Sequence, residues 1–137
     1  AITPASGFVG PVSAIVIGLA AGVICYLSVS LVKPFLKYDD SLDAFGIHGV
    51  GGIFGALATG VFATVAINPA GADGLLFGSA ALLGKQVVAI VASGAYSFIV
   101  TLIILKIVDV TIGVRVSNED EVQGLDLTQH SESGYTM

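Results

Sequence analysis

Charged residues are scarce in this sequence of 137 residues, where Asp, Glu, Lys and Arg together make up 11%. A soluble domain carries roughly 25% of such residues, because its surface must face water. Hydrophobic residues make up 55%, and the mean hydropathy is +0.95. Too few polar groups are present to cover the surface of a water-soluble fold. The composition therefore excludes a soluble globular domain and predicts a membrane protein whose outer surface contacts lipid.

Basic residues and cysteines are few as well. Five Lys and Arg do not make the basic surface that nucleic-acid binding requires, so we expect no nucleic-acid partner. The single cysteine, Cys25, excludes a disulfide framework, and we expect it to pack as a small buried hydrophobe. The first residues do not resemble a signal peptide, since no basic segment precedes a short apolar core. Because the chain starts at Ala1, we expect it to be a piece of a longer protein.

Three apolar runs are each long enough for a membrane-spanning helix, which needs about 20 residues. We expect the helices at about residues 8–33, 43–66 and 83–113. Lys33 and Pro34 are predicted to stop the first helix, and Gly113 is predicted to stop the third. A run of turn-forming residues, 68–71, follows the second. The predicted fold is an all-α membrane protein with three transmembrane helices, in a membrane part that spans residues 1–116.

Most basic residues lie on one side of the membrane in this topology. They are Lys33, Lys37, Lys106 and Arg115, which follow the first helix or lie at the end of the third. The loop between the second and third helices has no basic residue. Lys85, near the outer end of the third helix, has a side chain long enough to reach the interface. Because cytoplasmic loops carry an excess of Lys and Arg, we expect the C-terminus in the cytoplasm and the protein in the cell membrane.

The last residues, 117–137, are polar and form a separate cytoplasmic tail. Ser117 is a suitable N-cap for a short helix with acidic residues in its first turn, and Gly124 is a suitable end for it. The few apolar residues that follow are Leu125, Leu127 and Tyr135. Two states fit this composition: a disordered segment, or a tail that docks on the cytoplasmic loops and carries regulation.

One histidine, His48, lies in the second apolar run, where no other side chain between residues 44 and 67 carries a charge. An ionisable group at membrane depth is energetically costly and is by default a candidate for function. A neutral imidazole offers one N–H donor and one lone pair, which suits a narrow pore that passes a small N–H solute or relays a proton. The alternative is a histidine that hydrogen-bonds a neighbouring helix. The other histidine, His130, lies in the tail and cannot meet His48 within one subunit.

Acidic and small residues surround His48 in the sequence. We expect Asp40 to be the N-cap of the second helix and Asp43 to occupy its third position, and attraction of cations to the inner mouth of a pore is the alternative role. Glycines are dense after the histidine: they are Gly49, Gly51, Gly52 and Gly55. These glycines leave free volume beside the imidazole. Rows of small residues also let helix backbones approach closely in lipid, so helix packing is their other explanation.

The run Asp43–Gly52 reads D-A-F-G-I-H-G-V-G-G, and it resembles the signature D-x-F-G-x-H-G-x-x-G of ammonium transporters of the Amt/Mep/Rh family. Further matches extend the resemblance through nearly the whole chain, at residues 3–7, 59–63, 109–116, 124–126 and 130–135. The resemblance covers the C-terminal third of the family. That third comprises the last three of eleven helices in an inverted-repeat transporter fold, followed by the cytoplasmic tail.

The resemblance implies that the whole protein is a homotrimeric ammonium transporter or channel, with one pore in each subunit. His48 then corresponds to the second histidine of a pair at the pore centre, whose other member lies on an earlier helix, as does the aromatic gate. Ammonium or methylammonium would lose its proton and cross as the neutral amine, because an unpaired cation is costly in a dry pore. Such a protein is not an enzyme and has no metal or cofactor.

The resemblance also implies a regulatory role for the tail. The residues concerned are Gly124, Asp126, Thr128, His130 and Tyr135. Thr128 lies where some relatives carry a phosphorylation site, and a PII-type signal protein plugs the cytoplasmic side of the pore in some relatives. Ser131 stands where a glycine is more usual, which is a departure from the family pattern.

Three other functions fit parts of the sequence. An ammonium sensor of the same fold would bind ammonium with little flux and report it through the tail. A membrane haem protein would use His48 as an axial ligand, but it needs a second axial histidine at membrane depth that this sequence lacks. A non-conducting scaffold is the last alternative, since three helices alone do not enclose a pore.

Overall fold

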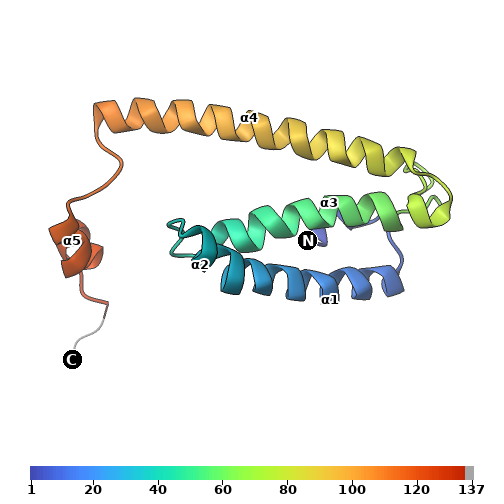
Figure 1. Cartoon of the computed structure of the whole chain (residues 1–137), viewed down its shortest axis with the longest axis horizontal. Coiled ribbons are helices and arrows are strands. Elements are labelled where there is room, and N and C mark those ends of the chain that lie inside the picture. The colour runs from blue at the N-terminus through green and yellow to red at the C-terminus, as the bar shows by residue number, and fades with distance from the viewer. Residues whose placement is uncertain (135–137) are drawn as a thin grey trace. The chain divides into compact units, whose positions relative to one another are not determined.

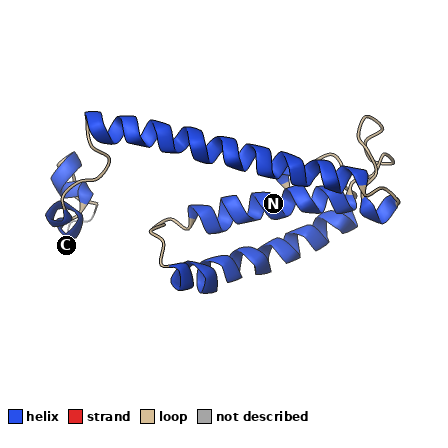
Figure 2. Cartoon of the chain, turned by 45° about the horizontal axis from the view of Figure 1, so that its top comes forward, coloured by secondary structure: helices blue, strands red, loops and turns tan. Residues whose placement is uncertain are grey.

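The computed structural model describes residues 1–134, and every regular element in that range is a helix (Figure 2). The chain divides into two compact units, Ala1–Gly94 and the residues from Ala95 onward. Three helices are long and apolar enough to cross a membrane, namely Pro11–Leu36, Phe45–Phe62 and Ala81–Thr111. The prediction of an all-α membrane protein with three transmembrane helices is therefore confirmed.

The first spanning helix contains a π-helical turn. It consists of α1 (Pro11–Leu27), the π turn Ser28–Val32 and α2 (Lys33–Leu36) (Figure 1). The predicted stop at Lys33 and Pro34 is wrong, because the helix continues to Leu36 and ends at Lys37, whose φ is 53°. A π turn widens the hydrogen-bond ladder. The turn ends two residues before Pro34, which has no N–H to contribute, and the helix accommodates this proline instead of ending at it.

The second spanning helix begins with another π turn, Phe45–Gly49, and continues as α3 (Val50–Phe62). It is shorter at both ends than the predicted range 43–66. At its start, Asp43 has a φ of 54°, which lies outside the helical region. Beyond its end, the N–H of Thr64 donates to the carbonyl of Phe8 at 3.0 Å instead of extending the helix. Bonds to distant residues thus set the end of the helix, and hydropathy does not reveal them.

Helices α1 and α3 lie side by side and run in opposite directions (Figure 1, Figure 2). The N-terminal segment, with its short helical turn Thr3–Ala5, packs on α3. Three buried residues, Ala5, Ile17 and Ala58, form a hydrophobic cluster in the described part of the chain. A close backbone approach requires glycine on α3, because a Cβ added to Gly55 would lie 1.9 Å from the carbonyl oxygen of Ala1.

The third spanning helix is α4 (Ala81–Thr111). The predicted stop is confirmed, since Gly113 has a φ of 78° and its N–H donates to the carbonyl of Val108 at 3.1 Å. The start of α4 packs closely on α3, where a Cβ added to Gly60 would lie 2.7 Å from the Cα of Leu83. No residue of α4 is buried within the described part of the chain. Lipid or further helices must therefore cover its apolar surface.

The tail forms two short helices, α5 (Asn118–Gln123) and α6 (Leu125–His130). The predicted N-cap is confirmed, because Ser117 Oγ accepts the N–H of Asp120 at 3.1 Å. Gly124 ends α5 with a φ of 101°, also as predicted. The second helix was not predicted. It starts at the same glycine, and Asp126 supplies an acidic residue to its first turn, where a negative charge is favourable.

Candidate functional site

His48 lies in the π turn Phe45–Gly49 at the start of the second spanning helix. In this turn the N–H of Val50 donates to the carbonyl of Phe45, five residues earlier, in place of the usual four. The His48 side chain is exposed and makes no hydrogen bond within residues 1–134. In the alternative role, His48 would form a hydrogen bond to a neighbouring helix. Within the described residues, His48 makes no such bond to α1 or α4.

The π turn of His48 packs against the π turn of the first spanning helix. Gly46 is buried at this contact, and a Cβ there would lie 2.8 Å from Val29 Cγ2 and 3.4 Å from Ser28 Oγ. Gly49 is close to its own turn, where a Cβ would lie 2.9 Å from Phe45 Cδ2. Two irregular turns on neighbouring helices thus meet beside His48, an arrangement that often marks functional positions.

The glycines after His48 lie in two different environments. A Cβ added to Gly51 would lie 3.1 Å from Cys25 Sγ, and Gly55 meets the N-terminal segment, so both glycines belong to the packed side of the helix. A Cβ added to Gly52 would meet nothing within 4 Å. His48 and Gly52 are therefore both open, while Gly51 and Gly55 are packed.

Cys25 differs from its predicted role as a buried hydrophobe. Its side chain is half-buried, and its thiol donates to the carbonyl of Ile47 at 3.7 Å. This carbonyl precedes His48 in the π turn. The bond joins α1 to the π turn, and no sequence pattern indicates it, because it depends on how the two helices pack.

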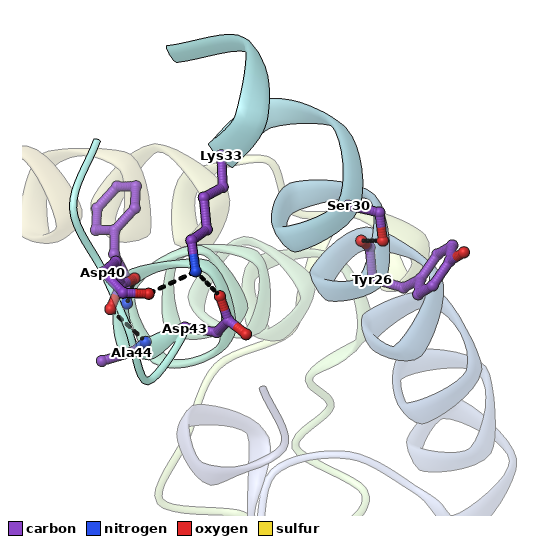
Figure 3. Close-up of polar contacts among 7 residues, drawn as sticks. Tyr26, Ser30, Lys33, Asp40, Asp43 and Ala44 are labelled. Carbon is purple, nitrogen blue, oxygen red and sulfur yellow. Dashed lines mark hydrogen bonds and ion pairs between the residues drawn. The ribbon is translucent and has the colours of Figure 1, made fainter. Parts of the chain in front are cut away.

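The acidic residues before the helix have two different roles. Both oxygens of Asp40 accept backbone N–H groups, from Ala44 and from Phe45, each at 2.9 Å, so Asp40 caps the helix (Figure 3). Asp43 does not occupy the third helical position that we predicted. It precedes the helix in a left-handed conformation, and its carboxylate binds the ammonium group of Lys33. The attraction of a lysine from the preceding helix, ten residues away in sequence, explains the difference.

The loop before the helix also contributes an aromatic contact. The ring of Tyr38 meets the ring of Phe45 edge-on, with centroids 5.9 Å apart and an interplanar angle of 88°. Such edge-to-face pairs are favourable beyond the area that they bury. The contact adds a further support to the first residue of the π turn, and sequence reasoning missed it.

The predicted tail residues from Gly124 to His130 lie in α6 or at its start. Thr128 Oγ1 donates to the carbonyl of Gly124 at 3.1 Å. The side chain of Asp126 lies close to Gly124, because a Cβ added to Gly124 would lie 2.7 Å from Asp126 Oδ1. His130 is the last residue of α6 and Ser131 follows with a φ of 53°. The glycine that the family resemblance implies at this position would suit such a left-handed conformation. Tyr135 lies outside the described residues.

An ion pair holds the start of the tail. Arg115 donates to Glu121 from Nε at 2.7 Å and from Nη2 at 2.9 Å, in a two-point arrangement. The hydrogen bonds from the guanidinium group stabilise the charged carboxylate and hold the pKa of Glu121 below its usual value. This pair belongs to the second compact unit, and His48 belongs to the first.

Comparison with known proteins gives three findings. The sequence profile of the Ammonium Transporter Family matches residues 1–135. An ammonium transporter of Bacillus subtilis is 52% identical over 135 residues, which are 98% of this chain and 33% of the relative. The ammonium transporter Amt1 of Archaeoglobus fulgidus is 51% identical over 137 residues, which are 99% of this chain and 34% of the relative. The chain thus spans about a third of the length of these curated relatives.

A solved structure gives the same result for the fold. The crystal structure of Saccharomyces cerevisiae Mep2 matches with a TM-score of 0.77 and 38% sequence identity. The match covers 86% of this chain and 28% of the Mep2 chain. The similarity noted from the D-x-F-G-x-H-G-x-x-G run is therefore confirmed in both sequence and structure.

Proposed function

The chain belongs to the Ammonium Transporter Family, and we propose that it is the C-terminal third of a transporter that conducts ammonium or ammonia past His48. The observation that supports this role is the open imidazole, which is exposed and has both ring nitrogens unbonded within residues 1–134. A histidine that served packing within this chain would bond α1 or α4. The ring of His48 is instead accessible to a partner from outside the chain.

The chemistry of the imidazole suits a small amine. A neutral ring donates one N–H and accepts one hydrogen bond, so it exchanges bonds with ammonia without holding it tightly. An unpaired ammonium ion in an apolar passage is far more costly than neutral ammonia. We therefore propose that ammonium gives its proton to a relay formed by His48 and a second histidine on an earlier helix, and that the nitrogen passes as neutral ammonia.

The surroundings of His48 support this role. Gly52, one helical turn further on, has open space where a side chain would stand. The packed glycines, Gly51 and Gly55, hold the other side of the helix on its neighbours. The helix thus presents an imidazole next to free volume, which a conducting path requires. Asp40 and Asp43 act as structural residues at the inner end in this proposal.

Membership of the family supports a proposal for the assembly and the location. We propose a homotrimer in the cell membrane, with the tail in the cytoplasm and the membrane part within residues 1–116. The residues from 117 onward, including Gly124, Asp126, Thr128, His130 and Tyr135, would form the regulatory tail. A PII-type signal protein is the proposed partner at that face. Transport moves ammonium across the membrane without converting it to another compound, so we propose neither an enzymatic reaction nor a cofactor.

The sensor is the second candidate within the same fold. It would keep ammonium binding and lose flux, so a transport assay beside a binding assay distinguishes the two. The haem protein is distinguished by a visible absorption band in the purified protein. The relatives named above are described as transporters, which favours transport over both alternatives.

The test is the variant His48→Ala in the complete protein. We expect uptake of ammonium and methylammonium to change strongly, in rate or in ion selectivity, while trimer assembly remains intact. Uptake is measured with labelled methylammonium and by current across a supported membrane, and assembly by size-exclusion chromatography. Transport and selectivity equal to those of the unmodified protein would contradict the role of His48.

A further inference from the structure

We propose that Lys33 is a positioning residue for His48. Its ammonium group joins the end of the first spanning helix to the residues that precede the π turn, and so fixes the depth at which the imidazole lies along the helix. This inference rests on the proposed function of His48. It adds a residue that lies on a different helix and does not itself reach the conducted molecule.

The contacts of Lys33 show a link between two helices. Its Nζ donates to the carboxylate of Asp43 and, at 2.6 Å, to the backbone carbonyl of Asp40 (Figure 3). The side chains of Lys33 and Asp43 are 27% and 32% exposed. Both side chains are therefore partly shielded from water, which reduces the screening of their charges. One side chain thus holds two points of the loop that leads into the helix of His48.

The backbone of Asp43 transmits the link to the π turn. Its φ of 54° lies in the left-handed region, which L-residues other than glycine seldom adopt and which Asp tolerates better than most. In this conformation its carbonyl accepts the N–H of Ile47 at 3.0 Å, one residue before His48. The ion pair therefore acts on a strained residue whose carbonyl makes a direct bond to the turn that carries the imidazole.

The first spanning helix holds the same turn at a second place. The thiol of Cys25 donates to the carbonyl of Ile47, and Gly46 packs on Ser28 and Val29. The turn is thus fixed against one helix by the lysine at its entrance and by the thiol near its centre. A π turn has an extra residue in its ladder, so it is able to relax to an α-helical turn and rotate the residues beyond it. Loss of the lysine link removes one of the restraints against that shift.

A second lysine provides a matched control. Lys37 ends the same spanning helix four residues after Lys33, is exposed, and makes no side-chain hydrogen bond or ion pair in the described part of the chain. Lys37→Met removes the same charge from the same end of the helix as Lys33→Met. A general effect of charge at this end would appear in both variants, and an effect of position would appear in Lys33→Met alone.

The experiment uses the complete transporter with the variants Lys33→Met, Asp43→Asn, the double variant, Lys33→Arg and Lys37→Met. The first readout is the ratio of ammonium to methylammonium transport. The second is the set of imidazole nitrogen resonances of His48, measured by solid-state NMR, which reports the position of the ring independently of flux. Asp43→Asn keeps the size of the side chain, and asparagine tolerates the left-handed backbone at this position. This variant therefore tests the proposal if Lys33→Met does not assemble.

We expect each single variant of the pair to change the transport ratio by about fivefold and to shift the resonances of His48. The double variant should change the ratio no more than either single variant, because both act through one link. Lys33→Arg should stay near the unmodified protein, and so should Lys37→Met. Unchanged resonances and an unchanged ratio in Lys33→Met and Asp43→Asn would overturn the proposal, as would an equal change in Lys37→Met.

The test separates this inference from the proposed function. If His48→Ala leaves transport unchanged, the conducting role of His48 fails, whatever the lysine variants do. If His48→Ala impairs transport while Lys33→Met moves neither the ratio nor the resonances, the positioning role alone fails. A loss of thermal stability without either change would mark Lys33 as a structural residue of the loop and would also overturn the inference.

Discussion

The carboxylate of Asp40 accepts the backbone N–H of Phe45 at 2.9 Å, so one side chain caps the first residue of the π turn that carries His48. Its other oxygen accepts the N–H of Ala44 at the same distance. These two N–H groups have no partner in the helix ladder, because a helix leaves its first donors unsatisfied.

We predict that Asp40→Ala lowers the free energy of unfolding by about 1–2 kcal/mol, the usual cost of losing an N-cap. Asp40→Asn should lose less, because its amide keeps one oxygen acceptor. Thermal denaturation of the purified protein measures both variants. An equal loss in the two variants, or no loss in Asp40→Ala, would contradict the capping role.

The sequence predicted the cap of this helix better than the residue that follows it. Capping is a local pattern, because an acidic residue a few positions before an apolar run satisfies N–H groups next to it. The conformation of Asp43 depends on Lys33 instead, which lies on the preceding helix. The spacing of residues along the sequence does not indicate a contact between two helices. The predicted third helical position of Asp43 is therefore wrong.

The same distinction explains the spans. Hydropathy predicted three helices because lipid requires about 20 apolar residues for each one. It did not predict the π turns, Ser28–Val32 and Phe45–Gly49, because they change the hydrogen-bond ladder without changing composition. The first of these turns ends two residues before Pro34, and the helix continues past this proline to Leu36. The candidate role of His48 is predicted from the rarity of ionisable residues at membrane depth. The exposure of its imidazole, in contrast, is seen only in the structure.

Two glycines of the second spanning helix should respond differently to the same substitution. A Cβ on Gly55 would lie 1.9 Å from the carbonyl oxygen of Ala1, and a backbone atom cannot rotate away as a side chain does. A Cβ on Gly52 would meet nothing within 4 Å in this chain. We predict that Gly55→Ala lowers stability by about 1–3 kcal/mol, the usual cost of overpacking.

Gly52→Ala is the matched control, three residues away on the same helix. We predict that it keeps the stability of the unmodified protein, and that the larger Gly52→Val reduces transport by narrowing the space beside His48. Thermal denaturation measures the first effect and methylammonium uptake the second. Equal destabilisation by the two alanine variants would show that the contact of Gly55 with the N-terminal segment is not what requires glycine there.

Removal of the end of the tail tests its regulatory role. The deletion of residues 124–137 removes α6 and leaves the three spanning helices, α5 and the pair of Arg115 and Glu121 intact. We predict lower transport activity, or loss of its regulation, with unchanged membrane insertion. Uptake and membrane fractionation measure the two effects. Unchanged uptake and regulation in the deletion variant would remove the tail from the mechanism.

The ion pair of Arg115 and Glu121 predicts a pH dependence for the tail. The guanidinium group holds the pKa of Glu121 below the ordinary glutamate value of 4.5. The unfolded tail therefore binds the proton at a higher pH than the folded tail does. By linkage, the pair contributes its stability above the ordinary value, and this contribution is lost as the pH falls through the lower value of the folded state.

Glu121→Gln should therefore destabilise the start of the tail at neutral pH and make no difference once the pH is below both values. The carboxyl carbon resonance of Glu121 should titrate below 4.5 in the folded protein, and hydrogen exchange of α5 should be faster in the variant at neutral pH. Glu119→Gln removes the same charge from the same first turn without contacting Arg115, and so it is the control. A negative charge near the helix N-terminus is favourable at both positions, so this effect is common to the two variants. Of the two residues, only Glu121 accepts hydrogen bonds from Arg115 in the described residues. The guanidinium contact therefore predicts a larger effect for Glu121→Gln than for Glu119→Gln.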